Sequence, residues 1–104
     1  GDRTREAAGL NNIGLIYAHL GEMQKALEYL NQALQLRRSI RNRTGEAETL
    51  HNFGAIYNDL GEKQKALDYY NQALSLQRAI GNGSEEVATL NNLGGVYADL
   101  GEMQ

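Results

Sequence analysis

Hydrophobic residues recur along this chain at helical spacing. From Ile13 onward, apolar side chains at Ile13, Ile16, Tyr17 and Leu20 follow the i, i+3, i+4, i+7 pattern. This pattern predicts an amphipathic helix with one face turned toward a core. The strict alternation of apolar and polar residues that marks a strand is absent, so we expect an all-α protein.

The pattern returns twice more along the chain. Tyr17, Tyr57 and Tyr97 recur at a spacing of 40 residues, and the residues around each of them also repeat. Self-similarity at such a period predicts a stacked array. Each repeat should hold two helices, so we expect repeat one at 1–40, repeat two at 41–80 and a partial third repeat at 81–104 with its first helix only. The expected first helices cover about 4–20, 44–60 and 84–100, and the second helices about 22–40 and 62–80.

Glycine and asparagine should set the helix boundaries, because the chain contains no proline. Gly21, Gly61 and Gly101 follow the last apolar residue of each first helix, where a left-handed residue ends a helix without steric penalty. Other glycines, at Gly14, Gly54 and Gly94, fall in the middle of these helices and should each cost about 1 kcal/mol relative to alanine. We therefore expect a close helix crossing at each of them.

Composition and charge limit the classes of partner. The 104-residue chain has a formal charge of −3, so no overall positive field attracts nucleic acid or an anionic membrane. No apolar run approaches the roughly 18 residues of a membrane span. Cysteine is absent, which excludes disulfides and thiolate metal sites and suits a reducing compartment. We therefore expect a cytoplasmic protein.

The repeat resembles the tetratricopeptide repeat. In repeat one the resemblance rests on seven spaced positions, which are Leu10, Ile13, Gly14, Tyr17, Ala26, Leu30 and Ala33. The same positions recur in register in repeat two. Two features depart from the family pattern: the period is 40 rather than about 34 residues, and arginine stands at Arg38 and Arg78, where the family often has proline. Forty-residue variants resemble the arrays of kinesin light chains and of G-protein regulators with Leu-Gly-Asn-type repeats.

The resemblance implies a fold and a general role. The fold is an α-solenoid of antiparallel helix pairs that winds into a right-handed superhelix, here with five helices. The role is a non-catalytic protein–protein interaction module that binds an extended peptide or a helix in a concave groove lined by the first helices.

Ligand-facing positions of the family can be carried over to this chain. They are Asn11, Asn12, Leu15, His19, His51, Asn52, Asn58, Asp59, Asn91, Asn92 and Asp99. Asn12, Asn52 and Asn92 place the same amide at the same helical phase in all three repeats. A side-chain amide has both a donor and an acceptor, so a ladder of amides can pair with an extended peptide backbone. The same amides can instead join neighbouring repeats, and the sequence leaves both interpretations open.

Charge on this face indicates the kind of partner. Asp59 and Asp99 make it acidic, so we expect a neutral or basic peptide. A clamp on a partner's terminal carboxylate requires lysine or arginine at the carried-over positions, and none is present.

Other kinds of site find little support. His19 and His51 should lie about 12 Å apart along their helices, too far to share one metal ion. Four arginines at 37, 38, 41 and 43 lack interleaved aromatic residues and are interpreted as a solvated helix end. Neither a catalytic set nor a phosphate-binding loop is present, so we expect no enzyme activity and no cofactor.

The last expected helix has no partner helix after it in this sequence. We therefore expect Leu90, Leu93, Val96, Tyr97 and Leu100 to be partly uncovered. An alternative function follows from this: a structural or self-assembling spacer whose copies associate through that helix.

Overall fold

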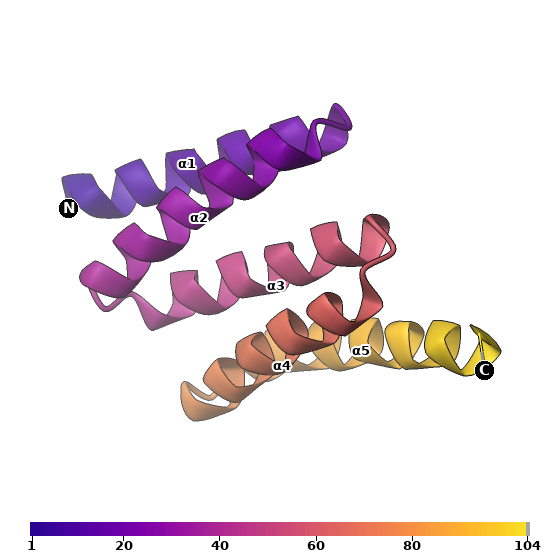
Figure 1. Cartoon of the computed structure of the whole chain (residues 1–104). Helices are drawn as coiled ribbons and strands as arrows, with labels where there is room; N and C mark the ends of the chain where they lie inside the picture. The colour runs from indigo at the N-terminus through magenta and orange to yellow at the C-terminus, as the bar shows by residue number, and fades with distance from the viewer. Residues whose placement is uncertain (104) are drawn as a thin grey trace.

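The chain is built entirely from helices in the part that the structure describes. The computed structural model describes residues 1–103, with side chains as far as Gly101. Its elements are α1 (Asp2–His19), α2 (Met23–Ser39), α3 (Arg43–Asp59), α4 (Lys63–Ala79) and α5 (Gly83–Met103) (Figure 1). The all-α prediction is confirmed, and the expected helix boundaries are correct to within a few residues.

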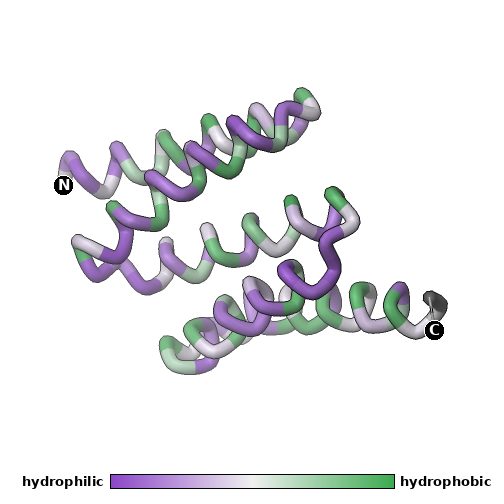
Figure 2. Tube along the Cα trace, viewed as in Figure 1, coloured by the Kyte–Doolittle hydropathy of each residue, from purple (hydrophilic) through white to green (hydrophobic). Residues whose placement is uncertain are grey.

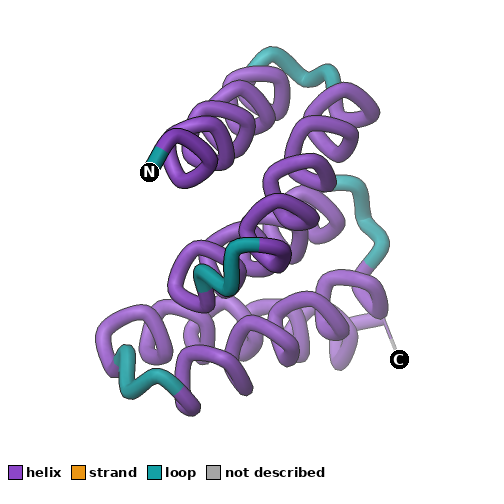
Figure 3. The backbone as a smooth tube through the Cα atoms, turned by 90° about the vertical axis from the view of Figure 1, so that its left-hand side faces the viewer, coloured by secondary structure: helices purple, strands orange, loops and turns teal. Residues whose placement is uncertain are grey.

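Helices pack in sequence order. α1 packs on α2 and α3 on α4, and these pairs are joined because α2 also packs on α3 and α4 on α5. The result is a thin, elongated body with extents of 47 × 33 × 18 Å, whose helices are joined by short connections (Figure 3). This is the layered arrangement of an α-solenoid, in which each repeat contacts only its neighbouring repeats.

The core is continuous across the repeats. One buried cluster joins residues of α2, α3 and α4: Ala26, Leu30, Leu34, Leu50, Phe53, Ile56 and Ala73. A second joins α4 to α5: Ala66, Leu67, Tyr70, Leu74, Leu93 and Val96. Hydrophobic positions recur along every helix in Figure 2. Not all of them are buried: Ile13, Ile16 and Leu20, which the sequence pattern placed on a core-facing side, are exposed. Burial of the side chains in the two clusters against the next repeat stabilises the stack, since no single pair covers all its apolar surface.

Helix ends follow the predicted glycines, with one exception. Gly21 and Gly61 adopt φ of +79° directly after α1 and α3, as expected of left-handed helix ends. Gly101 does not end α5, which continues through it to Met103. Glycine permits a left-handed turn without enforcing one, and no helix in the described part of the chain folds back onto α5 to require it.

The mid-helix glycines lie at close crossings in the two complete pairs. A Cβ on Gly14 would lie 3.0 Å from Leu30, and a Cβ on Gly54 would lie 2.7 Å from the Tyr70 ring. A Cβ on Gly94 would meet nothing within 4 Å. The predicted crossing is therefore confirmed for α1 and α3, and absent for α5.

The uncovered surface of α5 is smaller than expected. Leu93 and Val96 are buried against α4, whereas Leu90 and Tyr97 are exposed and Leu100 is half-buried. Tyr97 therefore differs from its counterparts, since Tyr17 stacks on Tyr29 and Tyr57 on Tyr69, each at 5.4 Å between ring centroids.

Candidate functional site

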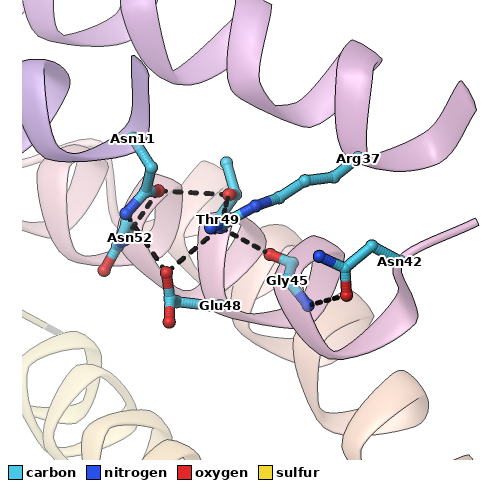
Figure 4. Close-up of polar contacts among 7 residues, drawn as sticks. All are labelled: Asn11, Arg37, Asn42, Gly45, Glu48, Thr49 and Asn52. Carbon is cyan, nitrogen blue, oxygen red and sulfur yellow. Dashed lines mark hydrogen bonds and ion pairs between the residues drawn. The ribbon is translucent and has the colours of Figure 1, made fainter. Parts of the chain in front are cut away.

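The candidate residues lie on the first helices α1, α3 and α5, and their polar side chains bond from one repeat to the next. Asn11 of α1 is at the centre of the first such junction. Its Oδ1 accepts hydrogen bonds from Thr49 Oγ1 at 3.1 Å and from Asn52 Nδ2 at 3.2 Å. Its Nδ2 donates to Glu48 Oε1 at 3.2 Å (Figure 4). One amide of repeat one thus holds three side chains of repeat two.

An equivalent junction joins α3 to α5. His51 occupies the position of Asn11, and its Nδ1 lies 2.9 Å from Thr89 Oγ1 while its Nε2 lies 3.1 Å from Asn92 Nδ2. Because the Asn92 nitrogen can only donate, Nε2 must accept, and the ring proton resides on Nδ1 and is donated to Thr89. The junction therefore requires neutral His51.

The electrostatics of His51 agree with this assignment. Burial lowers the pKa of His51 below its ordinary value of 6.5, and the nearby charge of Glu85 opposes that shift. The ring also packs edge-on against Tyr70, with 5.2 Å between centroids. Tyr70 is itself buried, and burial followed by the charge of Asp59 raises its pKa.

Two of the three recurring asparagines make the bond between neighbouring repeats that the sequence left open as the alternative to peptide binding. Asn52 and Asn92 each donate from Nδ2 to the preceding repeat, whereas Asn12 is exposed on α1. Both of these bonds use only the amide nitrogen, and an amide has two N–H groups and a carbonyl. The bond to the preceding repeat therefore fixes the orientation of the amide and leaves donor and acceptor capacity for a ligand.

Asn11 differs from the other candidates. It is only 2% exposed, and both ends of its amide are bonded within the protein. It supports Asn52 from behind and offers almost no surface to a partner. Asn11 is therefore no longer a candidate for direct contact with a partner.

The remaining candidates are more accessible. His19, Asp59 and Asn91 are exposed, while Leu15, Asn58 and Asp99 are half-buried. The structure brings Asn58 and Asp99 together through Lys63, the first residue of α4. Lys63 Nζ lies 2.6 Å from Asn58 Oδ1 and 3.1 Å from Asp99 Oδ2.

Lys63 was missed by sequence reasoning because it lies on a second helix. Its counterpart in repeat one is Met23, so the exchange of an apolar residue for a cation was visible in the repeat alignment. The ion pair neutralises part of the charge of Asp99. This face is therefore less acidic than its carboxylates alone suggested.

Arg37 is a correction to the expected solvated arginine cluster. It is buried, at 6% exposure, and its Nη1 donates to Gly45 O at 3.0 Å, to Glu48 Oε1 at 3.1 Å and to Thr49 Oγ1 at 2.8 Å (Figure 4). All three contacts come from Nη1, which carries two N–H groups, and they join α2 to α3. Arg38, Arg41 and Arg43 are exposed as expected.

The described residues also limit the class of site. In the described part of the chain, no three His, Cys, Asp or Glu side chains come together to form a metal site. No described helix combines the length and apolar character needed to cross a membrane.

Comparison with known proteins agrees with the helical geometry. A solved structure with a similar fold is BtubC (BKLC) from P. vanneervenii, which superposes with a TM-score of 0.85 at 24% sequence identity. The match covers 91% of this chain and 40% of the BtubC chain. At this identity the likeness concerns the fold alone. No curated protein matches the chain.

The sequence profile of the tetratricopeptide repeat family matches residues 5–79, which is most of the chain. It includes the helix pairs α1–α2 and α3–α4, together with the glycine crossings and tyrosine stacks described above. The chain therefore belongs to the tetratricopeptide repeat family.

Proposed function

We propose that this array is a non-catalytic interaction module that binds an extended segment of a partner protein along the face formed by α1, α3 and α5. Tetratricopeptide repeats generally mediate protein–protein interaction. The observation that carries the proposal for this chain is the recurrence of an asparagine amide at Asn12, Asn52 and Asn92.

The bonding of these amides supports the proposal. A ligand-binding amide must be held in one orientation, because a freely rotating side chain loses conformational entropy on binding. Asn52 is held by Asn11, and Asn92 by His51. The peptide backbone repeats an N–H and a C=O at every residue, so oriented amides on successive helices match it without reading its sequence.

Charge supports a neutral or basic partner. Asp59 is exposed and no ion pair involving it is found among the described residues, whereas Asp99 is paired with Lys63. The carboxylate of Asp59 on α3 should therefore provide most of the attraction to a basic partner. We expect this contribution to raise the association rate more than the affinity.

Matched substitutions test the proposal. A peptide selected from a random library for binding to the protein would be measured against the double variant Asn12→Ala with Asn92→Ala. We expect about a tenfold or larger loss of affinity, since each lost hydrogen bond contributes about 0.5–1.5 kcal/mol.

The control is a second asparagine pair. Asn31 and Asn71 are exposed on α2 and α4, and they too are 40 residues apart. Asn31→Ala with Asn71→Ala should leave the affinity unchanged. Equal losses for both double variants, or a loss in the control only, would rule out binding through the α1, α3 and α5 face.

A second candidate function is a spacer that associates with copies of itself. The observation that favours it is the exposure of apolar side chains on α5, at 58% for Val87, 41% for Leu90 and 57% for Tyr97. In α3 the equivalents of the first two, Ala47 and Leu50, are buried under the rest of the repeat. Uncovered apolar surface of this kind favours association.

Light scattering over a range of protein concentrations distinguishes the two candidates. A spacer of this kind should show a mass that rises with concentration, and Leu90→Glu should shift the rise to higher concentration by placing a charge in the contact. A constant monomer mass at high concentration would exclude the spacer and leave the peptide-binding proposal intact.

A further inference from the structure

A cavity of about 140 Å³ lies where α3, the end of α4 and the start of α5 meet. It is lined by Thr44, Ala47, Glu48, Gln77, Asn82 and Glu85. Two of these residues carry negative charge and none carries positive charge. A single water molecule needs only about 10–15 Å³, so the cavity has room for a group of several heavy atoms.

The equivalent place in repeat one is filled by the chain itself. Gln77 stands 40 residues after Arg37, and Asn82 and Glu85 stand 40 residues after Asn42 and Gly45. In repeat one the guanidinium of Arg37 lies at this junction and donates to three acceptors of α3. A guanidinium is therefore the group that this type of junction accommodates.

The sequence change between the two junctions removes that guanidinium. Arg37 can pass α3 only because residue 45 is glycine, since a Cβ there would lie 2.7 Å from Arg37 Nε. Repeat two replaces the arginine with the shorter, neutral Gln77 and the glycine with Glu85. The second junction thus loses a positive charge and gains the carboxylate of Glu85, while Ala88 replaces Glu48, the ion-pair partner of Arg37.

Without a guanidinium at this junction, a hydrogen-bond acceptor beside the cavity lacks a donor in the described part of the chain. Gln77 is 1% exposed, and its buried Oε1 has no hydrogen-bond partner among the residues that the structure describes. An unsatisfied buried acceptor costs about 1–3 kcal/mol, which a donor from outside would recover. Glu48 also lines the cavity, and its hydrogen bonds to Arg37 and Asn11 use only Oε1.

We propose that this cavity binds the guanidinium group of an arginine side chain supplied by a partner protein. The guanidinium is planar, carries five donors and is weakly hydrated, so it suits a small cavity with several acceptors. A lysine ammonium is more strongly hydrated and should bind less tightly. The inference rests on the proposed function in one respect: the arginine would belong to the bound partner and would anchor it beside Glu48.

A small probe tests the cavity separately from the peptide-binding face. Nα-acetyl-L-arginine amide would be titrated into ¹⁵N-labelled protein and followed by NMR. We expect saturable shifts of the Gln77 side-chain amide and of the backbone amides of residues 82–85. The lysine analogue should bind more weakly, and the uncharged citrulline analogue should cause no saturable shift.

Two variants sharpen the test. Glu85→Gln changes an exposed residue and should weaken arginine binding about tenfold by removing one charge-assisted contact. Gln77→Arg combined with Glu85→Gly restores the arginine and the glycine of repeat one, with Ala88 still in the place of Glu48, and should abolish binding by filling the cavity. Should that double variant fail to fold, Glu85→Gln still carries the test.

The controls separate this site from the peptide-binding face. Asp68→Asn removes an exposed carboxylate of α4 outside the cavity and should leave probe binding unchanged. Asn12→Ala with Asn92→Ala should also leave it unchanged, even if it abolishes peptide binding. Equal shifts with arginine and citrulline, or undiminished binding by Glu85→Gln, would overturn the proposed arginine site.

Discussion

At the scale of single residues, the mid-helix glycines distinguish α1 and α3, which cross closely over the helix that follows them, from α5. Gly54 lies against the Tyr70 ring, where a Cβ would approach to 2.7 Å, while Gly94 faces open space. The same residue at the same repeat position therefore has opposite consequences. In α3 it permits a crossing, and in α5 it only weakens the helix.

Alanine substitution at these two positions should change stability in opposite directions. Gly54→Ala should destabilise the protein, because the overpacking penalty of about 1–3 kcal/mol falls on a buried ring that has little room to move. Gly94→Ala should stabilise it by up to about 1 kcal/mol through helix propensity. Urea unfolding midpoints measure both effects. A stabilised Gly54→Ala variant would show that the crossing is looser than described.

Sequence reasoning succeeded for residues whose role is set by local geometry. Gly21 and Gly61 end helices because glycine tolerates positive φ, and this can be read from their position after an apolar run. It failed for Arg37 and Lys63, whose partners lie on other helices. A charged residue at a helix end is normally solvated, and only the packing of the next repeat shows which charges it covers.

At the scale of elements, the polar junctions between first helices follow the same plan in both places, with one difference. Asn11 and His51 occupy equivalent positions and contact equivalent partners, Thr49 and Asn52 in one case and Thr89 and Asn92 in the other. Only His51 can titrate. The contact between α3 and α5 should therefore depend on pH, whereas that between α1 and α3 should not depend on this position.

The direction of the pH dependence follows from the lowered pKa of His51. The unfolded chain takes up a proton near pH 6.5 and the folded chain only at lower pH, so the unfolded state binds more protons in between. The stabilising effect is complete above pH 6.5 and is lost as the pH falls below that value toward the folded pKa. Thermal unfolding between pH 7.5 and 5 should show this decrease.

His51→Asn is the natural control, because asparagine already occupies the equivalent positions Asn11 and Asn91. The variant should lose the His51-dependent part of the decrease while keeping the amide bonds to α5. If wild type and variant lose stability equally as the pH falls, the junction does not depend on neutral His51.

At the scale of the whole molecule, stacking of the repeats places α1, α3 and α5 side by side, so that equivalent residues form one continuous face. The helix pairs, their order and the candidate face were predictable, because a 40-residue period brings equivalent residues onto the same side of successive helices. Which of the polar residues on that face are buried and bonded within the protein, and which are exposed, was not predictable. Asn11 turned inward to support Asn52, while Asn12 one residue later remained exposed, and their types alone do not distinguish them.

The central claim is that a partner segment lies along α1, α3 and α5. NMR shift mapping of a library-selected peptide on the ¹⁵N-labelled protein tests it most directly, because asparagine side-chain amides report from both faces. The account predicts shifts at Asn12, Asn52 and Asn92 with Asn31 and Asn71 unmoved. Shifts confined to Asn31, Asn71 and the backbones of α2 and α4 would contradict it.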